Sequence, residues 1–427
     1  MTSRADTFRY VGLDVEVDRL VGRYELDGRH FREVVQFEGV GDLRDEVTRA
    51  VATLWYLVAG LSYYKTGSPR RLDLGTTPVG PRGRDLLRGA IIDGLGEFAY
   101  RNDLDLIDIQ LVGGVDAAPS TAVLDPNRVL TPFGGGIDSI VTVETLAPEL
   151  DQALFVVSPT RGRFDALEAA AAVTGRPVVR ASRALDPSLL EGDPSFLRGH
   201  VPVTAMVTML AAVAAVATGR GGVVMSNEHS ASVPNLEWRG RRVNHQWSKS
   251  WDAEVLIGDA VAEVVGPSLT VASFLRDRSE LWVARRFSEL AQYHHVFRSC
   301  NRAFAQDPAS RATTWCGECD KCLFINLVLA PYLPRPALRA IFGSEPLAAP
   351  AHLDQLRTLV GLGADHKPFE CVGDPDESVR ALHLVAARED WIDVGHVVEL
   401  ADSVDPTVDG DPYATLGPSR VPAHWLR

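Results

Sequence analysis

The chain has 427 residues, of which 46% are hydrophobic and 23% are charged. At about 100 to 200 residues per domain this length predicts two or three domains, and the composition excludes a mainly disordered or collagen-like chain. The formal net charge of -13 excludes an overall positive field that would draw the chain to nucleic acid or anionic lipid, and five cysteines are too few for a disulfide scaffold.

The N-terminal region combines a small sheet with helices. Its first seven residues carry no apolar stretch followed by a cleavage site, so we expect the protein to be cytoplasmic. Between Phe8 and Val40, short hydrophobic stretches separated by charged turns predict an antiparallel sheet. The patterns that follow predict helices over residues 43–61 and 86–100 and a strand over residues 104–112.

From residue 121 onward, predicted strands and helices alternate. The strands cover residues 128–133, 152–157, 177–181 and 222–226, and the helices between them cover residues 138–146, 164–174 and 201–218. Such alternation predicts an α/β fold with a Rossmann-like parallel sheet and helices on both faces. Residues 201–219 are uncharged and long enough to cross a bilayer, but their Ala and Thr content and Pro202 favour a buried helix.

The rest of the chain is predicted to be mainly helical. It is interrupted by a cysteine cluster and several prolines, and it ends in a Pro-, Gly- and Asp-rich stretch over residues 405–418 that we expect to be a loosely held tail. We therefore expect three regions. They are an N-terminal α+β domain over residues 1–120, a Rossmann-like domain that includes the cysteine cluster over residues 121–345, and a helical C-terminal region with a tail over residues 346–427.

Residues 134–139 read Gly-Gly-Gly-Ile-Asp-Ser and lie directly between a predicted strand and a predicted helix. Gly134, Gly135 and Gly136 let the backbone approach a ligand, and the free amides at the start of the helix favour an anion. Ser139 adds a hydroxyl donor, and Asp138 can position a magnesium ion. We expect phosphate groups to bind here, with Ser158, after the next strand, as a further contact.

This loop resembles the PP-loop of the ATP pyrophosphatase superfamily, whose usual form is Ser-Gly-Gly-x-Asp-Ser, although Gly134 replaces the first Ser. The resemblance implies that ATP is cleaved to AMP and pyrophosphate, with the AMP passed to a carboxylate or another oxygen. It is neither a Walker loop nor the dinucleotide-binding fingerprint, because the Gly-Lys-Ser/Thr sequence and the third glycine are missing. The alternative is a tight glycine turn without a ligand.

Four of the five cysteines are clustered. Cys316, Cys319 and Cys322 are spaced by two residues, and Cys300 lies upstream. Four thiolates suit one tetrahedral structural Zn²⁺, and because no histidine ligand is near we expect a closed site. An iron–sulfur cluster is the alternative metal site, and buried cysteines without a metal are the alternative without one.

A polar segment over residues 226–250 begins at the end of a predicted strand, where open parallel sheets bind their ligands. We expect its polar and basic groups to bind an acidic substrate. The expected substrate contacts are Asn227, Glu228, Arg241, Arg242, Asn244 and Lys249. The alternative is a solvated loop whose His229 and His245 only cap helices.

Several longer motifs are similar to those of the MurL family of ATP-dependent UDP-N-acetylmuramoyl-L-alanyl-L-glutamate epimerases. They are residues 94–102, 226–232, 243–249, 299–302, 315–322 and 365–373, within a similarity that runs from about Phe8 to about Trp391. Ile137 is a departure, because the family is expected to carry Lys there, and Lys249 would then have to replace that base. The PP-loop enzyme cyano-deazaguanine synthase also carries a similar four-cysteine zinc site.

The MurL resemblance implies epimerisation of the terminal L-Glu of UDP-MurNAc-L-Ala-L-Glu to D-Glu, with ATP, Mg²⁺ and structural Zn²⁺. Adenylating the α-carboxylate removes the charge that opposes loss of the α-proton, so that a base can form the enolate. We expect Asp138, His229, His245 and Lys249 to carry the catalysis, with His229 or His245 moving the proton. Cys371 and His366 are alternative bases, although Cys371 alone does not supply both faces of the substrate.

Two other functions compete with this one. Another PP-loop ligase or nucleobase-modifying enzyme resembling cyano-deazaguanine synthase would share the loop and the zinc site, but it would not account for the N-terminal region. A zinc protein that binds nucleic acid is disfavoured by the net charge of -13. We therefore expect the UDP-MurNAc-dipeptide as partner, with neither nucleic acid nor membrane, and we leave open whether the chain forms a homo-oligomer.

Overall fold

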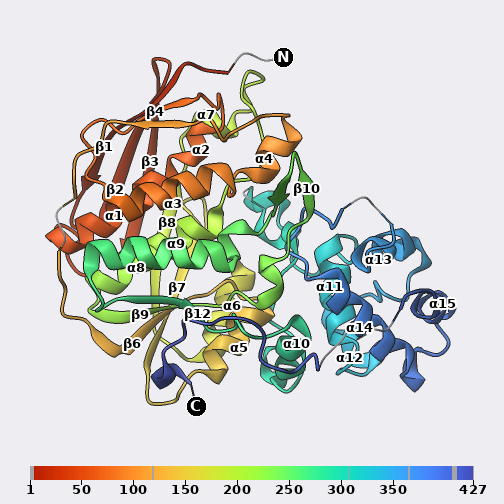
Figure 1. Cartoon of the computed structure of the whole chain (residues 1–427). Helices are drawn as coiled ribbons and strands as arrows, with labels where there is room; N and C mark the ends of the chain where they lie inside the picture. Colours follow the sequence, from red (N-terminus) through yellow and green to blue (C-terminus); the bar gives the residue numbers. More distant parts are fainter. Residues whose placement is uncertain (1–3, 118–119, 306, 364–365, 406–410, 427) are drawn as a thin grey trace.

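The computed structural model describes residues 4–117, 120–305, 307–363, 366–405 and 411–426, and it has a mixed α/β architecture (Figure 1). One large sheet contains most of the described strands, in the order β12-β9-β6-β7-β8-β3-β2-β1-β4-β5. Its strands are parallel except where β1, β2, β3 and β8 pair with one another. The predicted α/β class is therefore confirmed as a mixed sheet in which parallel pairing dominates.

The N-terminal strands form the antiparallel part of this sheet. They are β1 (Thr7–Val15), β2 (Arg19–Leu26) and β3 (Arg29–Glu38). Their side chains alternate between buried and solvent-accessible positions, as expected for a sheet covered on one face. The small antiparallel sheet predicted from the sequence is confirmed, but it is not separate, because β3 also pairs with β8 (Val178–Ala184).

The parallel strands are buried to different depths. They are β6 (Asp125–Pro132), β7 (Asp151–Pro159), β8, β9 (Arg220–Met225) and β12 (Thr270–Ser273). Strand β9 is buried throughout, and β8 is buried only at alternate positions. Neighbouring side chains within a strand enter different hydrophobic clusters: Val129 packs into one and Leu130 into the other. Two layers of helices therefore cover the sheet, as the alternating pattern predicts (Figure 1).

Each helical layer packs against one of these clusters. On one face lie α1 (Glu46–Ala59), α8 (Val203–Ala217) and α9 (Trp251–Val265). On the other lie α5 (Ile137–Thr145), α6 (Asp165–Thr174) and α10 (Glu280–Ser288). The uncharged segment that includes α8 is thus a buried helix, as predicted, and among the described residues no helix is long and apolar enough to cross a membrane.

Short elements were predicted less well than long ones. The helix expected over residues 43–61 continues as α2 (Leu61–Tyr64), and the one expected over residues 86–100 is two helices, α3 (Pro81–Ile92) and α4 (Gly96–Arg101). The strand expected over residues 104–112 is only β5 (Gln110–Val112). The strand β12 lies where helices were expected, and β4 (Arg71–Asp73) and α7 (Pro187–Leu190) had no prediction. Elements of three or four residues have too few side chains for a periodic pattern.

The C-terminal helices form a lobe beside the sheet (Figure 1). They are α11 (Asp320–Leu329), α12 (Arg335–Phe342), α13 (Leu353–Leu359), α14 (Pro375–Ala386) and α15 (Gly395–Ser403). Residues 406–410 of the predicted loose tail lie outside the described residues. The part from residue 411 onward is anchored, because the Tyr413 and Tyr332 hydroxyls lie 2.9 Å apart and Trp425 is buried against Gly222.

Candidate active site

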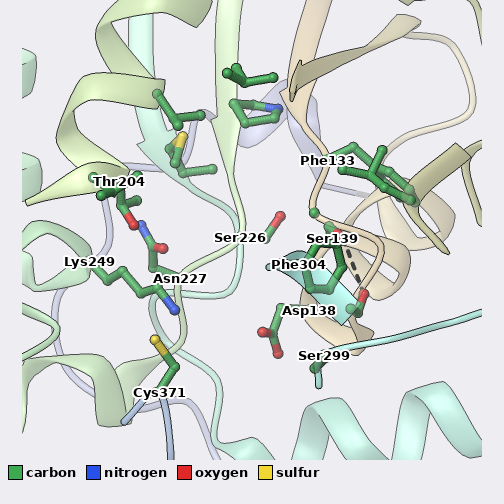
Figure 2. A pocket seen from close by; sticks show the side chains of 18 of the residues that line it. Phe133, Asp138, Ser139, Thr204, Ser226, Asn227, Lys249, Ser299, Phe304 and Cys371 are labelled. Carbon is green, nitrogen blue, oxygen red and sulfur yellow. Dashed lines mark hydrogen bonds between the residues drawn. The ribbon is translucent and has the colours of Figure 1, made fainter. Parts of the chain in front are cut away.

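A cavity of about 410 Å³ opens at the carboxyl ends of β6, β7 and β9. Pro132, Val157 and Ser226, which stand at or next to these strand ends, line its floor. Ligands of parallel sheets bind at this edge, because the loops that follow the strands diverge there. Figure 2 shows the side chains that converge on the cavity, with Asp138 and Ser139 on one side and Lys249 and Cys371 on the other.

The glycine loop predicted to bind phosphate lies at the cavity, between β6 and α5. Gly135 has a φ of 71°, a left-handed conformation that favours glycine. A Cβ atom on Gly136 would lie 2.7 Å from Ser299 Oγ, so the close approach of these segments requires glycine there too. Ser139 donates a hydrogen bond of 3.1 Å to the Gly136 carbonyl, which closes the first turn of the helix.

Asp138 is a half-buried residue on the cavity wall. Burial and the nearby charge of Glu228 raise its pKa to about 7. Among the described residues, its Oδ1 atom is a buried oxygen without a hydrogen-bond partner. The raised pKa shows that the negative charge of this carboxylate is unfavourable without a partner, and a bound cation would stabilise it. Carboxylate oxygens are ligands that Mg²⁺ prefers.

Ile137 does not point into the cavity. It is 1% exposed and belongs to the hydrophobic cluster beneath the loop. The bases that line the cavity are instead Lys249, Lys321 and Arg298. A lysine at the position of Ile137 is therefore not needed to place positive charge around the loop.

Cys371 and Lys249 lie side by side opposite Asp138 (Figure 2). Burial alone would raise the pKa of the Cys371 thiol, but the charge of Lys249 and a hydrogen bond with His245 lower it to about 6. The pKa of Lys249 is raised, because the attraction of Cys371 and Glu228 outweighs its burial. At neutral pH the pair is therefore a thiolate beside an ammonium group.

His245 connects Cys371 to a buried carboxylate. Its Nδ1 atom makes a short hydrogen bond with Glu97 on α4, and Glu97 also pairs with Arg101. Burial would lower the pKa of His245, but Cys371 and Glu97 raise it to about 9. Burial would raise the pKa of Glu97, but the hydrogen bond with His245 lowers it.

The other candidate bases do not line the cavity. His229 begins a short 3-10 helix and lies beside Gly417. A Cβ atom on Gly417 would lie 3.1 Å from Cε1 of the His229 ring. His366 Nδ1 bonds to the Lys367 carbonyl at 2.9 Å, and its ring packs against Phe369. Of the two histidines predicted to move the proton, only His245 is linked to a cavity residue.

The predicted binding residues divide in the same way. Asn227 and Lys249 line the cavity, and Glu228 is buried behind it, where its charge acts on Asp138. Ser158 lines a smaller neighbouring hollow that shares Phe164 with the cavity. Asn244 is a structural residue here, because its side chain donates to the Ala231 carbonyl at 2.9 Å and accepts from the Gln246 amide at 2.8 Å.

Arg241 and Arg242 lie on a two-stranded hairpin outside the cavity. The hairpin consists of β10 (Leu236–Trp238) and β11 (Arg241–Val243). Arg241 pairs with Asp93 at 2.7 Å, and Arg242 donates to the Ser232 carbonyl at 3.3 Å. The structure thus brings the glycine loop, Asn227 and Lys249 together, but not these two arginines.

Four cavity residues were missed or underrated from the sequence. Lys321 stands between two cluster cysteines, and Arg298 and Ser299 precede Cys300, so all three reach the cavity from the segments that carry the cluster. The sequence suggests Cys371 only as an alternative base. The sequence does carry a signal for Lys321, because a lysine between two clustered cysteines is held in a fixed position. The direction in which its side chain points, however, depends on the tertiary structure.

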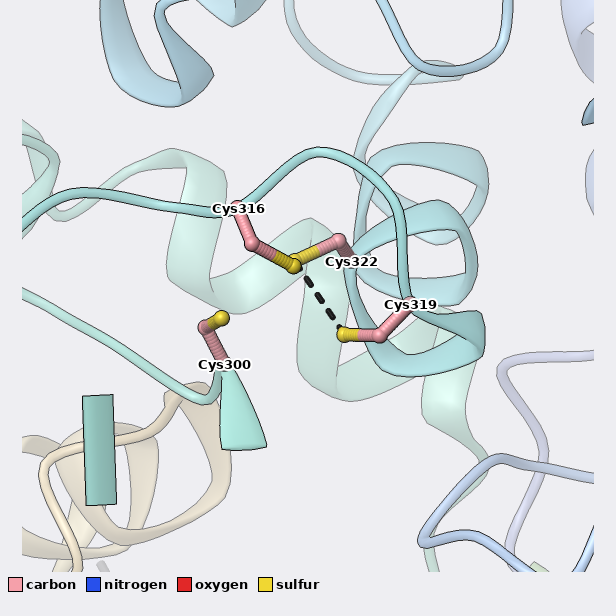
Figure 3. Close-up of side chains that lie close together, drawn as sticks. All are labelled: Cys300, Cys316, Cys319 and Cys322. Atoms are coloured by element: carbon pink, nitrogen blue, oxygen red, sulfur yellow. Dashed lines mark hydrogen bonds between the residues drawn. The ribbon is translucent and has the colours of Figure 1, made fainter. Parts of the chain in front are cut away.

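The four clustered cysteines converge in the C-terminal part of the chain (Figure 3). Cys319 caps the N-terminus of α11 and Cys322 lies in its first turn, while Cys300 faces them from a separate segment. Cys322 Sγ lies 3.5 Å from Cys316 Sγ and 3.4 Å from Cys319 Sγ, and all four sulfur atoms lie within 4.8 Å of one another. No disulfide joins them.

This geometry fits one tetrahedral metal ion. Four sulfur atoms at about 2.3 Å from zinc would lie roughly 3.8 Å from one another, close to the separations observed. Gly317, with a φ of 72°, makes the tight turn between Cys316 and Cys319. The cluster can therefore hold a metal such as zinc.

Comparisons with known proteins agree with the motifs. The family model described as the MurL N-terminal domain matches residues 1–274, and that of the MurL C-terminal domain matches residues 296–414. Three similar proteins are each named UDP-N-acetyl-alpha-D-muramoyl-L-alanyl-L-glutamate epimerase.

These relatives cover almost the whole chain. The protein from Salinispora tropica is 39% identical, over 99% of this chain and 94% of its own length. The proteins from a Micromonospora species and from Xanthomonas oryzae pv. oryzae are 38% and 35% identical, over 99% of this chain and 97% and 96% of their own lengths. The chain therefore belongs to the MurL family.

Proposed function

We propose that this protein converts the terminal L-Glu of UDP-MurNAc-L-Ala-L-Glu to D-Glu in an ATP-dependent reaction of peptidoglycan precursor synthesis. The names of its relatives support the substrate and the epimerisation. The observation that carries the ATP dependence is the glycine loop, which opens into the same cavity as Lys249 and Cys371. A phosphate-binding element and a proton-transfer group would thus share one cavity.

The loop side of the cavity suits ATP, in the manner of a PP-loop ATP pyrophosphatase. Gly134, Gly135, Gly136 and Ser139 would bind the phosphates through backbone amides and the hydroxyl group. Aromatic side chains line the same cavity and would cover the adenine ring; they are Phe133, Phe155, Phe164 and Phe304. Ser158, in the adjoining hollow, would contact the nucleotide from the next strand.

Asp138 would hold Mg²⁺, since its Oδ1 atom is buried without a partner. A bound Mg²⁺ supplies charge neutralisation between the phosphate oxygens. Lys321 and Arg298, which also line the cavity, would add fixed positive charge around the departing pyrophosphate. These residues would favour attack of the substrate carboxylate on the α-phosphate of ATP, which gives an acyl-adenylate and pyrophosphate.

The opposite wall suits the glutamate end of the substrate. Lys249 is held positively charged and lies beside Asn227, so the two can orient a carboxylate. Once the α-carboxylate is an acyl-adenylate, it no longer repels the electron pair left by the α-proton, and the enolate becomes accessible. Hydrolysis of the acyl-adenylate after reprotonation would release AMP and the D-Glu product.

Zinc in the four-cysteine cluster would be structural. All four thiols would be ligands, which leaves no open coordination position for substrate. The cluster joins the segment before Cys300 to the start of α11, and both segments place groups in the cavity. The metal would therefore fix Lys321 and Arg298 relative to the glycine loop. Because ATP and the nucleotide-linked substrate occur in the cytoplasm, we propose that the enzyme works there.

The test is incubation of the full chain with ATP, Mg²⁺ and UDP-MurNAc-L-Ala-L-Glu, followed by separation of the two diastereomers. We expect AMP, pyrophosphate and the D-Glu diastereomer, each dependent on both substrates. ATP cleavage that gives a nitrile, amide or thiolated base from a nucleobase substrate instead would support an enzyme resembling cyano-deazaguanine synthase. No ATP cleavage with any of these substrates would contradict the proposed function.

A further inference from the structure

We propose that Cys371 is the catalytic residue that exchanges the α-proton of the substrate glutamate, and that His245 and Glu97 are positioning residues that keep it a thiolate. This inference deepens the proposed function and rests on it. It also replaces His229 and His245 as the proton-transfer candidates suggested by the sequence.

Three distant segments build this arrangement. Glu97 lies on α4, His245 follows β11, and Cys371 lies in the loop before α14. The Glu97 carboxylate occupies Nδ1 of His245, so Nε2 is the ring nitrogen left to interact with the Cys371 thiol, which raises the pKa of His245. The result is a carboxylate–imidazolium–thiolate chain that ends in the cavity.

The loop that carries Cys371 is held in place from several sides. Gln246 donates to the Val372 carbonyl at 3.0 Å, and Asn235 donates to the Pro368 carbonyl at 2.7 Å. A Cβ atom on Gly373 would lie 2.6 Å from the ring of Phe324 on α11, so the loop packs closely there. A base for proton abstraction must be held near the substrate carbon, and these contacts give Cys371 a fixed position.

The charges around Cys371 favour a base there and disfavour His245 as the base. The charged and titratable groups that interact with the thiol are Lys249, His245, Lys321, Asp138 and Lys367. The positive groups among them stabilise the thiolate, which has a free electron pair to accept a proton. Cys371 and Glu97 raise the pKa of His245 to about 9, and the imidazolium that this favours at neutral pH has no lone pair for the substrate.

The proton-transfer step is balanced as follows. The Cys371 thiolate takes the proton from Cα of the acyl-adenylate, and the C–H electron pair moves to the carbonyl oxygen to form an enolate. A proton from water reaches the other face of Cα and gives the D-centre, while the Cys371 thiol returns its proton to water. Epimerisation in D₂O therefore places deuterium at Cα.

A metal ion is the competing explanation for part of this cluster, because donor atoms of Glu97, His200 and His245 lie within 4.8 Å of one another. We favour the hydrogen-bonded chain, since Glu97 is already shared between His245 and Arg101. We expect one tightly bound metal ion per chain, and we expect it to be lost when the cysteine cluster is disrupted. A second ion that is lost in Glu97→Gln would overturn the proposed chain.

The first experiment compares Cys371→Ala and Cys371→Ser with the wild type. We expect epimerisation and deuterium incorporation at Cα to fall by about 10²- to 10⁴-fold, while AMP formation with UDP-MurNAc-L-Ala-L-Glu persists. Unchanged metal content and melting temperature would show that the variants are folded. Wild-type rates of deuterium incorporation in Cys371→Ala would overturn the inference, whereas a wild-type protein that forms no AMP would instead contradict the proposed function.

The second experiment tests the positioning residues by the pH dependence of Cys371 alkylation with iodoacetamide, with Cys371→Ser as the blank. In the wild type the rate should rise with pH through a midpoint near 6. Glu97→Gln should move this midpoint, and the acidic limb of the epimerisation profile, upward by about one pH unit. The matched control Glu237→Gln, on the exposed position of β10, should leave both unchanged. An unshifted midpoint in Glu97→Gln would exclude the positioning role.

Discussion

The five cysteines of this chain occupy two different environments. Four of them face one another near the start of α11. Cys322 Sγ lies 3.5 Å from Cys316 Sγ and 3.4 Å from Cys319 Sγ. Cys371 instead faces a cavity and interacts with Lys249 and His245. The same type of side chain, a cysteine thiol, is thus a candidate metal ligand in one place and a candidate base in the other.

This difference shows that the partners of a thiol, more than its burial, decide its chemistry. Thiols surrounded by other thiols gain most from sharing a cation, while a thiol beside an ammonium and an imidazolium group is stabilised as a free thiolate. The two environments are adjacent, since Lys321 stands between two cluster cysteines and also lines the cavity. The predictions below test whether the two environments can be disturbed separately.

The largest effect is expected from Cys322→Ser. Cys322 is fully buried, and metal binding to such a cluster contributes roughly 10 kcal/mol or more to folding. We expect the variant to lose its metal and to unfold at a much lower temperature, whereas Cys371→Ser keeps both properties. Metal analysis and differential scanning calorimetry measure these quantities. A Cys322→Ser protein with full metal content and an unchanged melting temperature would remove the distinction between the two environments.

Asp138→Asn should disable the cavity without affecting the cluster. Loss of the buried charge that would hold Mg²⁺ should lower AMP and pyrophosphate formation by about 10²- to 10³-fold. Metal content at the cysteines should not change. The control is Asp85→Asn, an exposed residue on α3 whose partner is Arg82 at 3.5 Å, and it should react at the wild-type rate. Undiminished pyrophosphate release in Asp138→Asn would separate the glycine loop from ATP chemistry.

Glu377→Gln should change the pH dependence of stability. Glu377 on α14 accepts a hydrogen bond of 2.7 Å from the Glu280 amide, and burial raises its pKa to about 8. Glu377 contributes stability in full below its ordinary pKa of 4.5, and this contribution is lost as the pH rises toward 8, at up to about 1.4 kcal/mol per pH unit. A glutamine at position 377 has no charge to bury, so the variant does not lose this stability as the pH rises.

Melting temperatures from pH 5 to pH 8 provide the measurement. The advantage of Glu377→Gln over the wild type should grow with pH, while the exposed control Glu389→Gln should follow the wild type at every pH. Because Glu280 also contacts the Gly373 position beside Cys371, a matching change in the alkylation midpoint of Cys371 would show that Glu377 is coupled to the environment of Cys371. A constant difference across this pH range would contradict the pKa of Glu377.

The smallest effect is expected from Arg241→Ala. Arg241 pairs with Asp93 on a partly exposed surface, and such pairs contribute less than about 1 kcal/mol. We expect the KM for UDP-MurNAc-L-Ala-L-Glu to change by less than about threefold, in contrast to a large increase for Lys249→Ala in the cavity. An increase in KM of about tenfold or more would show that the substrate reaches the hairpin.

Sequence patterns were most informative where the structure is local. The strand, glycine loop and helix around Asp138 were predicted to within a few residues, since hydrophobic runs and glycines act over short distances. The pairing of β3 with β8 was not predicted, because nothing in either strand specifies an edge far along the chain. Likewise, β12 has only four residues, too few for a pattern.

The sequence by itself determined the local groups, which are the glycine loop between a strand and a helix and the three closely spaced cysteines that a single turn can bring to one metal. Only the tertiary structure decided which polar residues share the cavity. It placed Arg241 outside the cavity and brought Glu97, His245 and Cys371 together from three segments. The physical reason is that the pKa of a thiol depends on burial and on charges within a few ångströms, and those neighbours come from parts of the chain that only folding brings into contact.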